Sequence, residues 1–360
     1  MQLSSLLSRF SEPETLRMAK LGRELRAQGH DITDLSLGEP DFDTPEHIKL
    51  AAIKAVQDNF SHYPPVSGYL DLKEAVCTKL KRDNNLDYKP ENIIISTGAK
   101  QSIANLIMSV VDKGDEVIIP SPFWVTYSEI VKLVQGVPVI VSTSIENKYK
   151  ITPTELETAI TPRTKLFMFS SPCNPTGSVY SKHELGALAE VFRKYPAIFI
   201  MSDEIYEYIN YTPDGHQSIA QFDDLKNRIA IINGLSKGFA MTGYRLGYIA
   251  TNTTVAKACE KIQGQITSGA TAITQRAAIT ALTSDLKPTM EMVAAFKKRR
   301  QHILELIKEI PNIKCAEPDG AFYVFPVVIN YFGTKDGESI IENADDLCMY
   351  LLNKAQLSTV

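Results

Sequence analysis

Short runs of Ile, Val, Leu and Phe recur through the middle of the chain, and each run ends in small or polar residues. Five of them are "NIIISTG", "EVIIPSPFW", "KLFMFSSPCNP", "AIFIMSDEIY" and "RIAIINGLSK". A short apolar run that is bounded by turn-forming residues is typical of a strand buried on both faces. The pattern therefore predicts five buried strands between residues 92 and 237.

Helical patterns lie between several of these runs. After "IIISTG", the apolar residues Ile103, Leu106, Ile107 and Val110 share one helical face, and "KHELGALAEVFRKY" is spaced in the same way. Alternating strands and helices predict an α/β fold with a mostly parallel sheet that helices cover on both faces. Ligands bind such sheets beyond the carboxyl ends of the strands, so the polar ends of the five runs are expected to line one crevice.

Both ends of the chain carry further elements. We expect an amphipathic helix over residues 12–29, a helix that begins after Thr44 as N-cap with Pro45 in its first position, and a long helix over 290–309. "GAFYVF" reads as a strand, and "DDLCMYLLNKAQ" as a helix that leads into a strand at "LSTV".

The two ends are expected to form a smaller α+β domain. Its parts would be residues 1–41 and 290–360, the latter incomplete, and the large domain between them would span residues 42–289 and contain the crevice.

The composition of the chain mainly excludes some classes of partner. The chain has 360 residues, 44% of them hydrophobic and 22% charged, with a net charge of −4 and a pI near 5.9. This balance gives no electrostatic reason to expect nucleic acid or an anionic membrane as a partner, so a small molecule is the expected ligand. No signal-peptide pattern or membrane-spanning apolar run is present, and we expect a cytoplasmic protein.

Metal chemistry is not expected either. The five cysteines are scattered without a Cys-x-x-Cys pair, and the six histidines show no helical ligand spacing.

Lys237 is the first candidate catalytic residue, because it follows an apolar run and has small, mostly uncharged neighbours. An unpaired ammonium in such surroundings either reaches water or has a lowered pKa. A neutral lysine amine attacks carbonyl groups to form a Schiff base, and Arg245 is a candidate for the second cation that favours the neutral form. The alternative is an ordinary solvated loop lysine.

"STGAKQS" lies where a strand gives way to a helix. The free backbone N–H groups of Gly98, Ala99 and Lys100 would then point at a bound anion, most simply a phosphate. Ser236 and Arg245 are candidates for a hydroxyl and a guanidinium at the same phosphate. The alternative is a tight turn without a ligand.

Three strand ends add polar or aromatic side chains. Asp203 could hold a protonated ring nitrogen, which is the partner that pyridoxal phosphate needs. Tyr206 and Asn174 could donate to the phenolic oxygen of that ring, and Trp124 could stack on it. The alternatives are a capping role for Asp203, a turn role for Asn174 and core packing for Trp124.

The order of the motifs carries a family resemblance. "GEPDF", "GAK", "SPFW", "SPCNPTG", "SDEIYE" and "LSKGFAMTGYRLGY" follow one another along the chain. From about Leu16 onwards the chain resembles the class I aminotransferases, which are fold type I pyridoxal phosphate enzymes. It looks most like the bacterial branch of aspartate and prephenate aminotransferases, in which a tryptophan is typical where this chain has Tyr244.

The resemblance implies a role for each candidate at the cofactor. Lys237 would form the Schiff base and move the proton between substrate Cα and cofactor C4′. The remaining cofactor contacts would be Asp203 at the pyridine nitrogen, Tyr206 and Asn174 at the phenolic oxygen, Trp124 on the ring, and Gly98, Ala99, Lys100, Ser236 and Arg245 around the phosphate. Tyr63 would reach the phosphate of a neighbouring subunit, which implies a homodimer.

The resemblance also implies substrate contacts. The backbone of Gly38 would bind the α-carboxylate, Lys100 the distal carboxylate of aspartate or glutamate, and Trp124 and Asn174 would also contact the substrate. The family holds the α-carboxylate with an arginine near the C-terminus, but this chain has no arginine after Arg300. We therefore expect a segment to be missing, since spacing does not support Lys335 or Lys354 as a substitute.

The resemblance implies amino transfer from L-aspartate to 2-oxoglutarate as the activity. Three alternatives stay open: prephenate or another amino acid as the substrate, a pyridoxal phosphate-dependent lyase, and a chain that binds the cofactor without activity.

Overall fold

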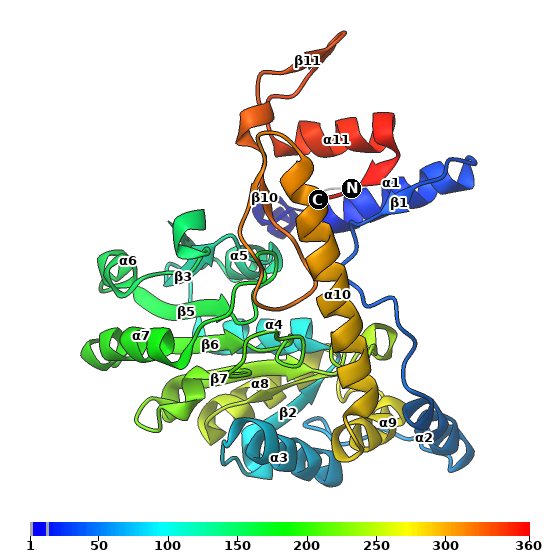
Figure 1. The fold of residues 1–360 in the computed structure, drawn as a ribbon. Helices are drawn as coiled ribbons and strands as arrows, with labels where there is room; N and C mark the ends of the chain where they lie inside the picture. The colour runs from blue at the N-terminus through cyan, green and yellow to red at the C-terminus, as the bar shows by residue number, and fades with distance from the viewer. Residues whose placement is uncertain (1–2, 12–13) are drawn as a thin grey trace.

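The computed structural model describes residues 3–11 and 14–360. Within this part of the chain, seven strands form one central sheet (Figure 1). Their order across the sheet is β2 (Ile93–Ser96), β8 (Gly247–Ala250), β7 (Ile229–Gly234), β6 (Phe199–Asp203), β5 (Thr164–Ser170), β3 (Glu116–Ser121) and β4 (Val137–Ser142).

The five strands predicted from the apolar runs are confirmed as β2, β3, β5, β6 and β7. The pairs from β7 to β4 are parallel, whereas β8 is antiparallel to both of its neighbours. The mostly parallel sheet that we predicted is therefore present, with β8 as the one strand of this sheet that runs the other way.

Helices cover both faces of the sheet, as predicted. Alternate residues of a strand enter different cores: Ile93 and Ile95 lie in one cluster, and Ile94 in the other. The first cluster contains side chains of α3 (Leu70–Asn84), α6 (Pro153–Ala159), α7 (Lys182–Lys194) and α9 (Ala272–Thr283). The second contains side chains of α4 (Ala99–Val110), α5 (Thr126–Leu133) and α8 (Thr253–Ile266).

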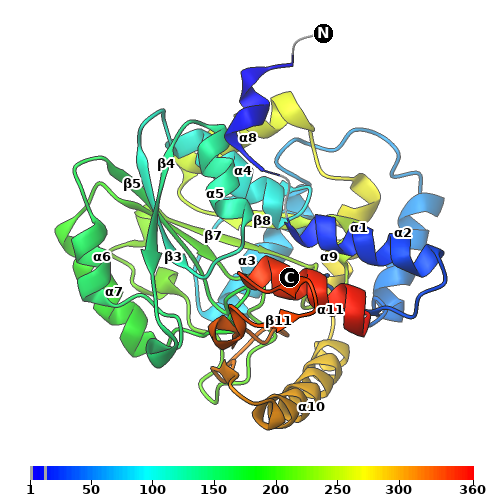
Figure 2. The same ribbon diagram turned by 90° about the horizontal axis from the view of Figure 1, so that it is seen from above.

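The two ends of the chain pack against each other. The predicted helix over 12–29 is α1 (Glu14–Ala27), and residues 12–13 lie outside the described part. Figure 2 shows α1 beside α11 (Ala344–Ala355), and Met18, Ile32 and Leu352 share a small core. The predicted strand at "LSTV" is β13 (Leu357–Ser358), which pairs in parallel with β1 (Thr33–Asp34).

One long helix extends from the region of the sheet to the packed chain ends. It is α10 (Lys287–Glu309), predicted over 290–309, and in Figure 1 it runs from the side of α9 towards α1 and α11. The remaining elements are α2 (Glu46–Gln57) and the short pairs of β9 (Lys314–Cys315) with β10 (Pro326–Val327) and of β11 (Lys335–Asp336) with β12 (Ser339–Ile340).

Two local predictions are wrong. Thr44 does not cap α2, because the helix begins at Glu46 and Pro45 occupies the N-cap position. The Thr44 hydroxyl, one residue earlier, donates a hydrogen bond of 2.6 Å to the carbonyl of Ala240. "GAFYVF" is not a strand, since Ala321 has a φ of +55° and its N–H donates to the carbonyl of Ile209 at 2.7 Å. Thr44 thus contacts the loop after Lys237, and Ala321 contacts the segment after Tyr206.

Candidate active site

Lys237 lies in the loop that follows β7, and its amine is enclosed. The Nζ atom donates a hydrogen bond of 2.5 Å to the carbonyl of Gly38, and the ring centroids of Tyr206 and Phe322 each lie 5.8 Å from it. Burial lowers the pKa of Lys237 to about 8; the charge of Arg245 lowers it further, while Glu39 and Asp203 oppose the shift. At neutral pH a useful fraction of the amine is therefore uncharged and nucleophilic.

Asp203 ends β6 and is buried. Its Oδ2 atom accepts a hydrogen bond of 2.6 Å from the Tyr127 hydroxyl, and its Oδ1 atom accepts one of 3.2 Å from the N–H of Ile205. Burial raises the pKa of Asp203 to about 6, against the effect of these two donors. The capping contact that we kept as an alternative is thus present on Oδ1, while Oδ2 is held by the Tyr127 hydroxyl.

A pair of tyrosines connects the lysine to the "SPCNPTG" loop. The hydroxyls of Tyr206 and Tyr323 are hydrogen-bonded to each other, and Asn174 Nδ2 donates to Tyr323 Oη at 3.3 Å. A Cβ at Gly38 would overlap the Tyr323 hydroxyl and lie 3.2 Å from Cζ. Glycine at position 38 therefore lets Tyr323 and Lys237 approach the same backbone.

The predicted anion site lies at the start of α4. Gly98 precedes the helix with a φ of +82°, and a Cβ there would overlap the guanidinium of Arg245, with Cζ 2.9 Å away. The backbone N–H groups of Ala99 and Lys100 donate no hydrogen bond to the described residues. A helix N-terminus with free N–H groups beside a guanidinium is suited to bind a phosphate.

Two more donor side chains of the predicted set are little used within the described part of the chain. Arg245 makes one hydrogen bond, of 2.8 Å to the carbonyl of Thr242, and no ion pair with a described carboxylate. The hydroxyl of Ser236, next to Lys237, makes no hydrogen bond to the described residues. The Ser236 hydroxyl and the remaining N–H groups of the Arg245 guanidinium are thus available to a phosphate.

Lys100 and Trp124 connect the anion site to Asp203. Lys100 Nζ lies 4.8 Å from the centroid of the Trp124 ring, which packs edge-on against Tyr127 at 5.8 Å. Burial and the charge of Arg245 lower the pKa of Lys100. Tyr127 in turn holds Asp203, so one series of contacts runs from the helix N-terminus to the buried carboxylate.

Tyr63 is the predicted residue that the structure does not bring to this site. Its side chain is 96% exposed, so it contributes nothing to the site within one chain.

Sequence reasoning missed Tyr127 and Tyr323. Tyr127 stands three residues after Trp124, on the first turn of α5, and an aromatic residue so close to a strand end is the signal that was available. Tyr323 lies in "GAFYVF", which we expected to be a strand, so it was not considered as a site residue.

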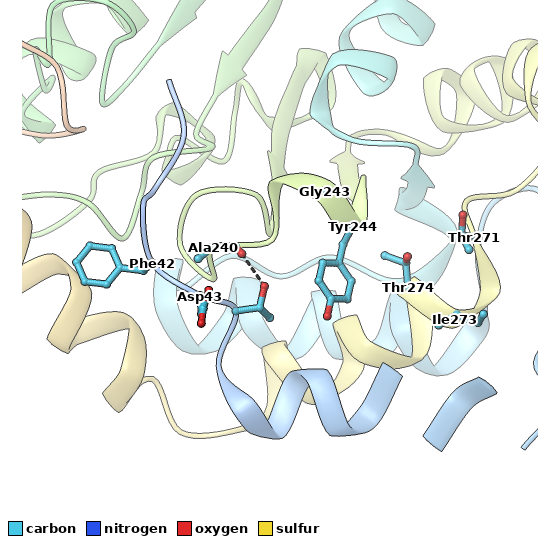
Figure 3. A pocket seen from close by; sticks show the side chains of 9 residues that line it. Phe42, Asp43, Ala240, Gly243, Tyr244, Thr271, Ile273 and Thr274 are labelled. Atoms are coloured by element: carbon cyan, nitrogen blue, oxygen red, sulfur yellow. Dashed lines mark hydrogen bonds between the residues drawn. The ribbon is translucent and has the colours of Figure 1, made fainter. Parts of the chain in front are cut away.

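An open pocket of about 530 Å³ lies near the lysine loop but is not the predicted site. Its walls come from the segment after Gly38, the loop after Lys237 and the start of α9, as Figure 3 shows. They are formed by Phe42, Asp43, Thr44, Ala240, Gly243, Tyr244, Thr271, Ile273 and Thr274. None of the residues predicted for the site lines this pocket.

Two kinds of feature are absent from the described residues. No group of three or more His, Cys, Asp or Glu side chains in that part of the chain is arranged to hold a metal ion. None of its helices is both long and apolar enough to cross a membrane.

A lysine of lowered pKa, a buried carboxylate and a helix N-terminus with free N–H groups lie at or just after the carboxyl ends of β7, β6 and β2. This combination suits the class of enzymes that bind a phosphorylated carbonyl cofactor through an amine. Residues 30–358 match the model of the family "Aminotransferase class I and II". The chain belongs to this family, and it is an aminotransferase.

The similar relatives and solved structures are aminotransferases as well. An aspartate/prephenate aminotransferase of Nitrosomonas europaea is 44% identical, with 100% of this chain and 91% of that protein covered. A bifunctional aspartate aminotransferase and glutamate/aspartate-prephenate aminotransferase of Petunia hybrida is 42% identical, at 99% and 76% coverage. The aspartate aminotransferase of Rhizobium meliloti superposes with a TM-score of 0.95 at 36% identity, covering 99% of this chain and 90% of that one.

The predicted family, fold and cofactor are therefore confirmed: the chain has the fold of aspartate aminotransferases and depends on pyridoxal 5'-phosphate. The residues present fit this group. Glycine at position 98 leaves room for the Arg245 guanidinium, the unused donors suit a phosphate, and Asp203 and Lys237 suit a ring nitrogen and an aldehyde.

Proposed function

We propose that this enzyme transfers the amino group of L-aspartate to 2-oxoglutarate and that Lys237 is its catalytic residue. The observation that carries the proposal is the enclosed amine of Lys237, whose pKa is lowered to about 8 and which lies among Gly38, Tyr206 and Phe322. Lys237 would attach the cofactor and then move a proton to and from the substrate Cα.

The other predicted residues would hold the cofactor. Bound pyridoxal phosphate supplies a ring that withdraws electrons from the substrate Cα. Asp203 would keep the ring nitrogen protonated, and Tyr127 would orient Asp203. The remaining contacts would be Tyr206 and Asn174 at the phenolic oxygen, Trp124 on the ring face, and Gly98, Ala99, Lys100, Ser236 and Arg245 at the phosphate.

Dicarboxylic substrates are favoured by Lys100. Its Nζ atom is fixed over Trp124 and pairs with no described carboxylate, so it is available to a distal carboxylate. The solved relative from Thermus thermophilus with maleate, a dicarboxylate, has a TM-score of 0.92 at 35% identity, with 99% of this chain and 91% of that one covered. Prephenate also has a second carboxylate, and the relative from Nitrosomonas europaea has it in its name.

The α-carboxylate of the substrate would bind at the backbone of Gly38, with Trp124 and Asn174 beside it. Lys335 is exposed, and Lys354 lies 3.5 Å from the Asp336 carboxylate, so neither is a candidate for this role.

The domain division, the assembly and the location belong to the same proposal. Residues 1–41 and 290–360 would form the smaller domain, and residues 42–289 the large domain. A homodimer is supported by the exposed apolar side chains of Leu50, Ile53 and Val56 on α2 and by the exposed Tyr63. A cytoplasmic location is supported by the cysteines, since all five are free thiols.

The test is a coupled assay of the purified chain with pyridoxal phosphate, aspartate and 2-oxoglutarate, with Lys237→Ala as the control. We expect oxaloacetate and glutamate from the wild type and neither from the variant. Ammonia in place of glutamate would assign a lyase, and turnover with prephenate but not with 2-oxoglutarate would replace the proposed acceptor. Cofactor binding without any turnover would leave the chain inactive and contradict the proposal.

A further inference from the structure

A buried ion pair lies behind the active site. Lys79 of α3 and Glu207, which follows Tyr206, are bonded to each other, and their side chains are 1% and 4% exposed. Asn84 completes the cluster: its Oδ1 accepts from Lys79 Nζ at 2.7 Å, and its Nδ2 donates to Glu207 Oε2 at 3.0 Å. Removing two charges from water costs free energy, so such a pair calls for a role besides stability.

The pair holds the beginning of the loop that carries Lys237. Glu207 Oε1 accepts a hydrogen bond of 2.8 Å from Asn233 Nδ2, and Asn233 Oδ1 accepts one of 2.7 Å from the N–H of Gly234. These are the last two residues of β7. A Cβ at Gly234 would lie 2.8 Å from the carbonyl of Leu246, so this strand end also packs tightly against its neighbour.

The same cluster holds the other end of the loop. Tyr208 donates a hydrogen bond of 2.6 Å to Asp83 Oδ2, and Asp83 lies 3.9 Å from Lys79 Nζ. A Cβ at Gly238 would lie 2.5 Å from the Tyr208 ring, and Phe239 packs edge-on against that ring at 5.6 Å. The two residues after Tyr206 thus contact the chain on both sides of Lys237.

We propose that Lys79 and Glu207 are positioning residues, which fix both ends of the Lys237 loop and so keep the amine enclosed. This inference rests on the proposed role of Lys237. Glu207 needs both carboxylate oxygens, because Oε1 accepts from Asn233 and Oε2 from Asn84. Glutamine would turn one of these acceptors into a donor that faces a donor.

Loosening of the loop has a measurable consequence. The groups that face the Lys237 amine are Glu39 on the N-terminal segment, Asp203 and Tyr206 after β6, and Arg245 before β8. An amine that moves into water loses the effect of burial, and its pKa rises towards the ordinary lysine value of 10.5. Fewer amines are then neutral at pH 7, so covalent attachment of an aldehyde becomes slower.

The experiment measures the rate at which pyridoxal phosphate attaches to the cofactor-free protein between pH 6 and pH 10, trapped with borohydride and quantified by mass spectrometry. For Lys79→Met/Glu207→Gln, we expect the midpoint of this profile to rise by about one unit and the rate at pH 7 to fall about tenfold. Lys150→Met/Glu184→Gln is the matched control, because it neutralises a partly buried pair that contacts neither end of the loop. Its midpoint should equal that of the wild type.

Asn233→Ala is the second variant, since it leaves Lys79, Glu207 and Asn84 paired and therefore retains the buried charges in balance. Its midpoint should move in the same direction. Wild-type midpoints in both folded variants would overturn the inference while the proposed function stands. Peptide mapping that finds the cofactor on a lysine other than Lys237 in the wild type would instead overturn the proposed function.

Discussion

At the scale of single residues, the candidate site contains two groups whose charged forms are disfavoured by burial. Lys237 is a buried cation whose pKa is lowered to about 8, and Asp203 is a buried acid whose pKa is raised to about 6. Both arrangements are unfavourable for the cofactor-free fold, because burial penalises each charged form. Function and stability therefore pull in opposite directions at these two positions.

Lys237→Met should stabilise the cofactor-free protein at pH 7. One pKa unit corresponds to about 1.4 kcal/mol, so the buried ammonium costs about 3 kcal/mol below pH 8. The penalty is fully present below the folded pKa, and it fades as the pH rises towards 10.5, where the unfolded amine also becomes neutral. Urea unfolding at pH 7 and pH 10 measures the difference, with the exposed Lys297→Met on α10 as the control. A gain that is equal at both pH values would contradict the buried-cation explanation.

Asp203→Asn should separate cofactor attachment from turnover. The amide keeps the shape that Tyr127 and Ile205 hold, but it cannot carry the negative charge that stabilises a protonated ring nitrogen. We expect attachment at Lys237 to persist and kcat for amino transfer to fall by about 10²-fold. Borohydride trapping and steady-state kinetics on the same sample give both numbers. A variant with wild-type kcat would exclude this role for Asp203.

Most of the candidate site residues can be predicted from their position in the sequence, but the residues that support them cannot. Lys237, Asp203 and Arg245 follow strand ends or stand in glycine-rich loops, so their position along the chain already indicates chemistry. Tyr323 is different, because it reaches the site only through an irregular segment that binds Ile209 and Gly177 by backbone hydrogen bonds. Such tertiary contacts leave no periodic pattern in the sequence.

At the scale of elements, the predictions that hold are those carried by buried runs of large apolar residues. The five confirmed strands have almost entirely buried residues and therefore read as uninterrupted apolar runs. β4 lies at the sheet edge, and none of its residues is fully buried. β8 is as short and as buried as β2, but its sequence Gly-Tyr-Ile-Ala contains one β-branched residue against three in β2, so it does not read as an apolar run. The Thr44 prediction is wrong because α2 begins one residue later than expected, at Glu46, with Pro45 in the N-cap position.

The junction of β2 and α4 gives a prediction with a matched control. Gly98→Ala should weaken the binding of pyridoxal phosphate, because the new Cβ would displace the Arg245 guanidinium. Gly114→Ala shares the backbone cost, since its φ is +88°, but no atom lies within 4 Å of its Cβ position. We expect about tenfold weaker binding for Gly98→Ala than for Gly114→Ala in fluorescence titrations. Equal affinities would show that the guanidinium is not part of the phosphate site.

At the scale of the whole molecule, segments far apart in the sequence come together at the chain ends and at the candidate site. β1 and β13 pair although they come from opposite ends of the chain, and the carbonyl of Gly38 meets Lys237 from the N-terminal segment. Tyr63 has no such partner in one chain, because its side chain is 96% exposed. If the site is completed by a second copy, Tyr63 belongs to the phosphate site of the other subunit.

Mixing two chains with different defects tests this assignment. Tyr63→Ala should weaken cofactor binding about tenfold by removing a hydrogen bond to a charged group, and Lys237→Ala should abolish attachment. In a heterodimer of the two variants, the site with Lys237 receives Tyr63 from the other chain. Random exchange should then restore roughly a quarter of all sites to wild-type affinity, measured as activity at limiting pyridoxal phosphate. Lys237→Ala mixed with Asp203→Asn is the control, because both residues would serve the site of their own chain. No site of that heterodimer is complete, so activity should not be restored. Activity that stays at the level of the parents in the first mixture would place Tyr63 outside the neighbouring site.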